Sequence, residues 1–317
     1  MKVMMFVGSP EVQLVQPTSR YTLRERFILQ LDWAGRLSMS NWLLGVLLGI
    51  VQGVSEWLPI SSKTQVIIVS NLLFGLSFTQ GYALGLFLEA GTFIAAVYYF
   101  RKEVWKVLRA LVGKGDDEGK TLLRFLIVVT IFTAVVGVVI YKTVSESYSG
   151  PVLGIPMIAL GCVLLGDAFL ISVARSKYAP TKGLSNLSLK EMVAIGIVQG
   201  IAAFPGVSRS GVTVSSMLLL GINPKDSFRL SFLALIPASI GAAGVTLVLS
   251  PDQIDTAINA AGVPVILLSI VVAVLVGVAL IRLLLRVAGS QRIALLTASL
   301  GVLAVISGVV SILVGAG

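Results

Sequence analysis

The chain has 317 residues, of which 56% are hydrophobic and only 12% charged, and its mean hydropathy is +0.97. Soluble domains carry about 25% charged residues, so this composition excludes an ordinary soluble protein. Long apolar windows, such as residues 127–141 and 263–281, predict an all-α polytopic membrane protein. The windows do not alternate between apolar and polar residues, which excludes a transmembrane β-barrel.

The net charge and the missing residue types exclude several kinds of binding and catalytic site. The net charge of +9 comes from basic residues that flank the apolar windows instead of forming one stripe, so we expect no nucleic-acid binding. The sequence contains no histidine, which excludes imidazole bases, phosphohistidine and histidine-ligated zinc. The one cysteine, Cys162, lies in an apolar window, so the chain can form no internal disulfide and no cysteine-rich metal site.

Residues 1–40 differ in character from the rest of the chain. Apolar and charged residues interleave at helical spacing over 21–37, which predicts an amphipathic helix on the membrane surface. A disordered extension, or translation that starts at Met39, is the alternative. The segment is not typical of a signal peptide, because no apolar core precedes a small-residue cleavage site. We expect residues 41–317 to form a single membrane domain.

The first element of that domain is apolar over 42–58, polar over 59–65 and apolar again over 66–76. Neither apolar part reaches the roughly 20 residues that a straight crossing needs. We therefore predict a re-entrant helix–break–helix hairpin, which is tolerated at membrane depth where protein buries it or water lines it. Glycines spaced four residues apart give its first helix a smooth face for close packing: Gly45, Gly49 and Gly53.

A second hairpin of the same kind is predicted at 192–220, where GIVQG at 196–200 repeats the pentapeptide at 49–53. About six further transmembrane helices are predicted, at 81–100, 125–141, 152–173, 230–249, 263–285 and 293–314. Each half, about 41–175 and 190–317, then has one hairpin and three spans. Because three is odd, the halves are predicted to be inverted repeats whose hairpins meet near the membrane midplane.

The loop charges predict an orientation in the cell membrane. Lysine and arginine gather in four loops, at 101–124, 174–191, 222–229 and 286–292. The loops at 142–150 and 250–262 hold one lysine, no arginine and three acids. The positive-inside rule makes the first group cytoplasmic, so the first hairpin opens outward and the second inward. The arginines of residues 1–40 disagree, and a first hairpin that crossed the membrane would remove this conflict; we favour the hairpin.

Acids inside apolar segments are the first candidate site residues. Glu56 follows Gln52 by four residues on one helical face. An ionisable residue there costs roughly 2.5–3.5 kcal/mol, so Glu56 marks a site or a buried partner. Gln52 can hold a substrate oxygen, a metal-bound water or Glu56, or it can join helices, as Gln199 would in the second hairpin. Glu89 is a partner for Glu56 or part of an ion path, whereas Asp167 can reach the interface.

The second polar break, PGVSRSGVT at 205–213, has the composition of an anion site. Gly206 and Gly211 allow left-handed backbone, and the amides of a helix that opens at Val214 would point back into the break. Arg209 supplies a planar cation suited to phosphate or carboxylate, with an ion pair to Glu56 or Glu89 as the alternative. Hydroxyl donors come from Ser208, Ser210 and Thr213.

In the first break, Ser61 and Ser62 are also common helix caps, and Lys63 could activate a serine, reach a phosphate or reach the interface. Together the two breaks describe an anion held beside an acid. Composition and spacing do not distinguish hydrolysis from transport.

The two breaks resemble the paired motifs of the bacitracin-resistance undecaprenyl-diphosphate phosphatase family. Its first motif is (E/Q)xxxE followed by LP[IV]SS and then by a histidine; this sequence reads QGVSE at 52–56 and LPISS at 58–62. Its second motif, PGxSRSGxT, is matched in full at 205–213. The resemblance runs from about residue 41 to the C-terminus.

This resemblance implies an enzyme that removes the terminal phosphate of a polyprenyl diphosphate and regenerates the monophosphate lipid carrier, supported by Mg²⁺ or Ca²⁺. It implies that Gln52 and Glu56 are the acidic-motif pair, with Glu56 a candidate metal ligand. It also implies that Ser62 is tied to catalysis and that Arg209 binds phosphate. Further substrate contacts are expected from Ser61, Gln65, Gly206, Ser208, Ser210, Gly211, Thr213 and Glu89.

The sequence departs from the family at Gln65, which stands where the histidine falls and cannot exchange protons near neutral pH. If that histidine is a general base in the family, Glu56 or Glu89 must take over its role here, or the site does something else. We expect Glu56 to activate either Ser62 or a water for in-line attack. A translocator of anionic lipids is the alternative function, because broken helices in inverted repeats are also a transporter design. The lipid, including an archaeal dolichyl-type carrier, and the oligomeric state, including a homodimer, stay open.

Overall fold

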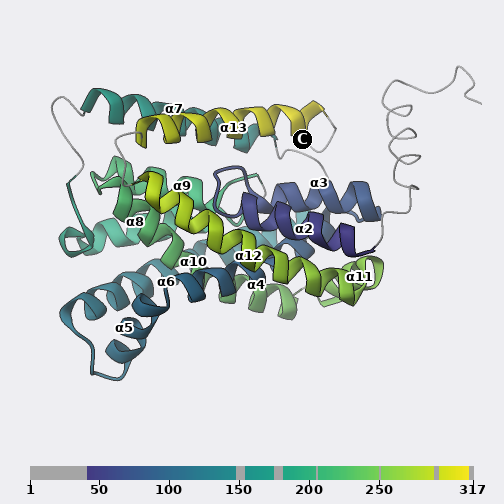
Figure 1. The fold of residues 1–317 in the computed structure, drawn as a ribbon, viewed down its shortest axis with the longest axis horizontal. Coiled ribbons are helices and arrows are strands. Elements are labelled where there is room, and N and C mark those ends of the chain that lie inside the picture. The colour runs from purple at the N-terminus through teal and green to yellow at the C-terminus, as the bar shows by residue number, and fades with distance from the viewer. Residues whose placement is uncertain are drawn as a thin grey trace, which may run out of the picture. The chain divides into compact units, whose positions relative to one another are not determined.

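The computed structural model describes residues 41–147, 154–174, 181–204, 206–249, 251–288 and 293–313, and the amphipathic helix predicted at 21–37 lies outside them. Every regular element in the described part is a helix, which confirms the predicted all-α class (Figure 1). The helices are α2 (Asn41–Ser55), α3 (Ser62–Phe74), α4 (Phe78–Tyr99), α5 (Arg101–Leu111), α6 (Asp117–Ser147), α7 (Gly154–Ala174), η1 (Leu184–Asn186), α8 (Leu189–Ile201), α9 (Arg209–Leu219), α10 (Pro224–Leu249), α11 (Pro251–Ala261), α12 (Val263–Ala288) and α13 (Ile293–Leu313).

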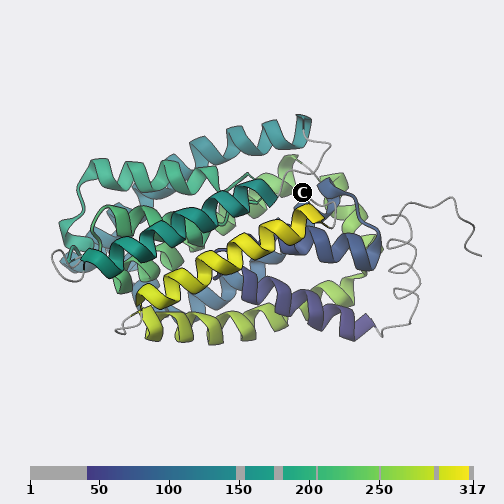
Figure 2. The same cartoon turned by 90° about the horizontal axis from the view of Figure 1, so that it is seen from above.

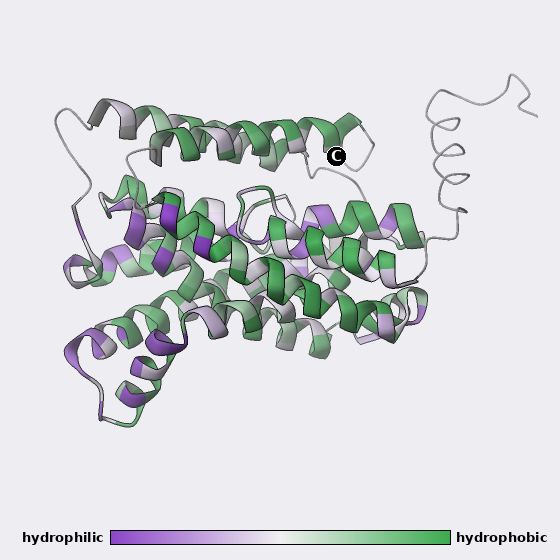
Figure 3. Ribbon diagram, in the orientation of Figure 1, coloured by the Kyte–Doolittle hydropathy of each residue, from purple (hydrophilic) through white to green (hydrophobic). Residues whose placement is uncertain are grey.

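Five of the described helices are long and apolar enough to cross a membrane. Apolar residues run along most of their length (Figure 3). The spans are Gln80–Tyr99, Asp117–Thr143, Pro224–Leu249, Val263–Ala288 and Ala294–Leu313. Shorter apolar helices cover Trp42–Ser55 in α2 and Met157–Gly166 in the predicted span 152–173. The protein is therefore a multi-pass membrane protein.

Two predicted loops contain helices, so those loop predictions are wrong. Helix α5 occupies the start of the basic loop 101–124, and α11 fills most of 250–262. Both are short and carry charge, so a search for long apolar windows does not find them, although the sequence of α5 is amphipathic. Arg229 of α10 lies 3.1 Å from Glu118 of α6 and 3.7 Å from Glu103 of α5, which ties this end of the molecule together.

The predicted packing role of the helix glycines is confirmed. A Cβ added at Gly45, Gly49 or Gly53 of α2 would come within 2.6–2.9 Å of atoms of α12. A Cβ at Gly196 or Gly200 of α8 would likewise come within 2.6–2.8 Å of α6. These contacts are too close for any side chain, so the glycines set the distance between the paired helices.

The helices pair across the two predicted halves of the chain. Helix α2 of the first half lies along α12 of the second, while α8 of the second half lies along α6 of the first. Helix α4 packs on α10, and α7 lies beside α13 in both views (Figures 1 and 2). Each hairpin is thus held by a long helix of the other half, which brings the two polar breaks toward each other.

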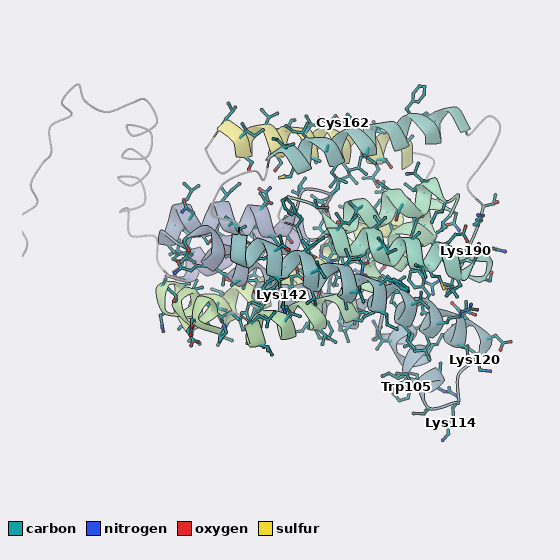
Figure 4. All side chains as sticks on the ribbon, turned by 180° about the vertical axis from the view of Figure 1, so that it is seen from behind. Trp105, Lys114, Lys120, Lys142, Cys162 and Lys190 are labelled. Carbon is teal, nitrogen blue, oxygen red and sulfur yellow. The ribbon has the colours of Figure 1, made fainter. Side chains whose placement is uncertain are left out.

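Basic side chains gather at one end of the helices. Figure 4 shows Trp105, Lys114, Lys120 and Lys190 at that end, whereas Lys142 lies away from it. The first three belong to the α5–α6 hairpin and Lys190 to the start of α8, so these two parts of the chain lie at the same end of the helices.

Candidate active site

The first polar break lies between α2 and α3. Helix α2 ends at Ser55 and α3 begins at Ser62, so the polar residues 62–65 form the first turn of α3 instead of preceding it. Ser61, just before that turn, has a φ of +52°; among the described residues it is the one non-glycine residue with positive φ. Backbone strain of this kind is often held in place at functional sites.

Glu56 is the centre of the hydrogen bonds in this break. Its side chain is only 2% exposed, and its Oε2 accepts a hydrogen bond of 2.8 Å from Gln52 Nε2 and one of 2.7 Å from Ser62 Oγ. The shared helical face of Gln52 and Glu56 is therefore confirmed. A hydroxyl that donates to a buried carboxylate has a base in place to receive its proton.

The second break differs in detail from the prediction. Gly206 has the predicted positive φ, at +91°. Helix α9, however, begins at Arg209, so the predicted start at Val214 is wrong. Ser208 caps it by accepting a hydrogen bond of 3.3 Å from the amide of Gly211, which lies inside the helix with no left-handed backbone. A capping serine competes well for these first amides, so the helix can start earlier than its apolar run.

The serines and the glycine of the second break join it to the first. Ser208 Oγ and Ser210 Oγ each donate to the carbonyl oxygen of Leu58 at 3.1 Å. A Cβ at Gly211 would lie 2.9 Å from Pro59 Cβ, so only glycine lets α9 approach this closely. The two breaks therefore meet, and in this structure these hydroxyls hold the breaks together.

Two other predicted substrate ligands contact neighbouring helices. Thr213 Oγ1 lies 2.5 Å from Ser231 Oγ of α10 and donates to the carbonyl oxygen of Arg209 at 2.6 Å. Gln65 Nε2 donates to the carbonyl oxygen of Ile60 at 3.0 Å and to Ser307 Oγ of α13 at 2.7 Å. The hydroxyl of Ser61 lies 3.0 Å from that of Thr64. Their roles toward substrate stay predictions, and the side chain of Asp167 lies outside the described part.

Arg209 connects the acids of the two breaks. Its Nη2 is ion-paired with Glu56 Oε1 and lies 3.3 Å from Glu89 Oε2. Glu89 Oε1 lies 3.0 Å from Lys63 Nζ, so the order of contacts is Glu56–Arg209–Glu89–Lys63. We call these four residues the charge cluster; their side chains are 2%, 8%, 1% and 8% exposed, respectively.

Ser239 of α10 completes the charge cluster. Arg209 Nη1 donates to Ser239 Oγ at 3.4 Å, and that hydroxyl donates to Glu89 Oε2 at 3.1 Å. Sequence reasoning missed Ser239, because one serine in an apolar span gives no signal of its own. Lys63 was a candidate, yet its partner, an acid 26 positions away in another helix, could not be read from the sequence.

A cavity of about 130 Å³ opens beside the charge cluster. Its walls come from α4, α6, α8 and α10 and are almost entirely apolar, with small residues such as Ala134, Gly137 and Gly241. Its charged lining consists of Lys63, Glu89 and Arg209. Gln52, Glu56 and Ser62 lie outside the lining; Glu56 contacts Arg209, and the other two contact Glu56. The cavity thus has an apolar body and a charged end.

The residues present fit a divalent cation bound together with phosphate. No three Asp, Glu or Cys side chains converge anywhere in the described ranges. Glu56 and Glu89 nevertheless contact the same nitrogen of Arg209, and the buried Oε1 of Gln52 has no hydrogen-bond partner in the described part. Mg²⁺ commonly takes one or two carboxylates and completes its shell with waters and substrate phosphates, which this oxygen-rich set allows.

Comparison with known proteins agrees with this geometry. The family described as "Bacitracin resistance protein BacA" matches residues 45–306. The chain belongs to this family. Similar proteins named "Undecaprenyl-diphosphatase" occur in Saccharolobus solfataricus, 49% identical over 86% of this chain and 98% of the relative, and in Sulfurisphaera tokodaii, 43% identical over 85% and 98%. One from Pyrobaculum aerophilum is 39% identical over 85% and 99%. The matched range contains both polar breaks and all four residues of the charge cluster.

Proposed function

We propose that this protein is an integral-membrane phosphatase that hydrolyses a polyprenyl diphosphate, of the undecaprenyl type, to the monophosphate lipid carrier and inorganic phosphate. The observation that carries the proposal is the position of the charge cluster at the end of an apolar cavity. An apolar wall fits a prenyl chain, and two buried cations fit a diphosphate. The names of the relatives support this reaction and give no support to the translocator alternative.

Arg209 is proposed to bind the terminal phosphate. It lines the cavity and also contacts Glu56, which lies outside the lining. For the terminal phosphate to approach Glu56 and Ser62, Arg209 must exchange a carboxylate partner for a phosphate oxygen. A guanidinium can make this exchange while it stays charged and fully hydrogen-bonded, because its five N–H groups can serve two acceptors at once.

Glu56 and Ser62 are proposed to start the reaction. Ser62 Oγ already donates to Glu56 Oε2 at 2.7 Å, so Glu56 takes its proton as the oxygen attacks the terminal phosphorus in line. The bond from that phosphorus to the bridging oxygen breaks, and the electron pair stays on the lipid monophosphate. Water then releases phosphate from Ser62. Gln52 holds Glu56 in place through its 2.8 Å hydrogen bond.

A divalent cation, Mg²⁺ or Ca²⁺, is proposed to assist. Glu56 and Glu89 would hold it together with Gln52 Oε1, once Arg209 has turned toward phosphate. When bound, such an ion neutralises phosphate charge and so lowers the barrier to transfer.

We further propose that the two halves, about 41–175 and 190–317, are inverted repeats with re-entrant hairpins α2–α3 and α8–α9. The exchanged pairing of α2 with α12 and of α8 with α6 supports this arrangement. The basic end, with loops 101–124 and 174–191, is then cytoplasmic. The cavity, lined by Tyr82, Tyr141 and Val245 near the opposite ends of their helices, opens toward the outer leaflet.

The test is phosphate release by the purified protein in detergent, with farnesyl or a longer polyprenyl diphosphate and with Mg²⁺, Ca²⁺ or EDTA. We expect release of one phosphate per lipid, dependent on the cation. No release from any chain length with either cation would contradict the proposal and return the translocator to consideration.

A further inference from the structure

We infer that Lys63 forms a second phosphate position, filled in this structure by the Glu89 carboxylate, and binds there the phosphate that stays on the lipid. The inference rests on the proposed diphosphatase function and assigns a role to a cation that this function leaves unused. It begins with the position of Lys63, which lines the cavity. Its side chain is 8% exposed, and its Nζ lies 3.0 Å from Glu89 Oε1. A buried lysine that faces a cavity, instead of extending to the interface, indicates an anionic ligand.

The spacing of the two cations fits two linked phosphates. Lys63 Nζ and Arg209 Nη2 contact the two different oxygens of the Glu89 carboxylate, at 3.0 and 3.3 Å. The two cations are therefore separated by one carboxylate group. Two phosphates that share a bridging oxygen span a similar length, so a diphosphate can replace Glu89 between the two cations and contact both.

The order of contacts assigns one phosphate to each cation. Ser62 contacts Glu56, and Glu56 contacts Arg209 but not Lys63, so the phosphate that is attacked is the one at Arg209. Lys63 and Glu89 line the cavity itself, next to the apolar walls that would hold the prenyl chain. The phosphate joined to the lipid therefore lies at Lys63.

Charge balance supports the same assignment. In this structure two acids and two cations of the charge cluster balance, as buried charges must. A diphosphate brings more negative charge than Arg209 alone can compensate. In the reaction the bridging oxygen takes the electron pair of the broken bond, so negative charge grows on the lipid phosphate. An ammonium group held at this phosphate stabilises that charge where it develops.

The test measures binding of each product separately. The probes are farnesyl monophosphate, which carries the lipid-side phosphate, and inorganic phosphate, each measured as an inhibitor of phosphate release and by calorimetry. For Lys63→Gln we expect the inhibition constant of farnesyl monophosphate to rise about 10- to 100-fold, as for loss of a charge-assisted hydrogen bond. The constant for inorganic phosphate should change less than 3-fold, and Lys63→Arg should recover most of the monophosphate affinity.

Two further variants keep the test decisive. Lys63→Gln leaves Glu89 with Arg209 as its remaining ionic partner, so Lys63→Gln/Glu89→Gln removes both charges and should fold even where the single variant does not. The matched control is the exposed Lys114→Gln, which should change neither constant. Unchanged monophosphate affinity in both Lys63→Gln and Lys63→Gln/Glu89→Gln would overturn the inference while the wild-type activity stands. Absence of wild-type activity would instead overturn the proposed function, and calorimetry would still report on Lys63.

Discussion

Replacement of Arg209 with alanine tests the charge cluster most directly. Arg209 contacts both Glu56 and Glu89, and only 8% of its side chain is exposed. In Arg209→Ala, Glu89 keeps Lys63 as a partner, but Glu56 keeps only the neutral donors Gln52 and Ser62. Removal of one partner of a buried ion pair lowers the free energy of unfolding by about 3–5 kcal/mol, because the other charge stays buried without compensation. We expect the lower end, about 3 kcal/mol, because Glu56 retains two hydrogen bonds.

The loss of activity should be larger than this loss of stability explains. An arginine that contacts a transferred phosphoryl group contributes about 10³- to 10⁵-fold to the rate, so phosphate release by Arg209→Ala should fall at least about 10³-fold. The assays are phosphate release in detergent at equal amounts of monodisperse protein, and unfolding by SDS titration in mixed micelles. Arg282→Ala, an exposed arginine of α12, is the matched control and should change neither.

A double variant separates the two effects. Arg209→Ala/Glu56→Gln removes both members of the buried pair, so most of the lost stability should return while the activity stays absent. If Arg209→Ala is as stable as the wild type, the electrostatic account of the cluster is refuted. Phosphate release near the wild-type rate from the single variant would refute the assignment of Arg209 to phosphate.

Three other predictions concern separate parts of the site and its support. Ser62→Ala should lower phosphate release about 10³-fold or more if its hydroxyl attacks phosphorus, and near-normal release would assign the attack to water. Gly211→Val should destabilise the protein by about 1–3 kcal/mol in SDS titration and reduce activity, because a Cβ there lies 2.9 Å from Pro59; unchanged stability would contradict this contact. Hydrogen bonds from Lys182 and from the capping serine lower the pKa of Glu191 to about 2. The Lys182–Glu191 pair should stabilise the start of α8 above the unfolded pKa of about 4.3, and this stabilisation should be lost as the pH falls toward 2. Glu191→Gln should therefore be less stable than the wild type at pH 7 but equally stable at pH 2. An equal difference in stability at both pH values would contradict this prediction.

The broad architecture could be predicted from the sequence because few backbone structures are stable inside a lipid bilayer. Long apolar windows must become helices, and polar breaks inside them must be buried against protein. The glycines at 45, 49 and 53 therefore predicted close packing correctly, but no pattern named α12 as their partner. Helix α5 was missed because its amphipathic sequence is short and basic, and the start of α9 was misplaced because Ser208 caps it before the apolar run begins.

Within the site, the residue types were easier to predict than their partners. Glu56, Gln52 and Arg209 stood out because charge and amide groups are costly in apolar segments. Whether Arg209 faces an acid or a ligand depends on distances between helices that the sequence does not contain. The structure shows an arginine between two acids, with Lys63 beyond the second.

Gln65, the residue that departs from the family's first motif, has defined hydrogen-bond partners in the structure. The Gln65 amide donates to Ile60 and to Ser307 of α13, and an amide at this position cannot exchange protons as an imidazole would. The group that can receive a proton from a nucleophile is instead Glu56, which accepts the hydrogen bond of Ser62. We expect Arg209 and Lys63 to stabilise the negative charge that an imidazolium would otherwise help to stabilise. We therefore expect two acids and two cations to supply the base and the charge stabilisation from separate residues, in a chain that contains no histidine.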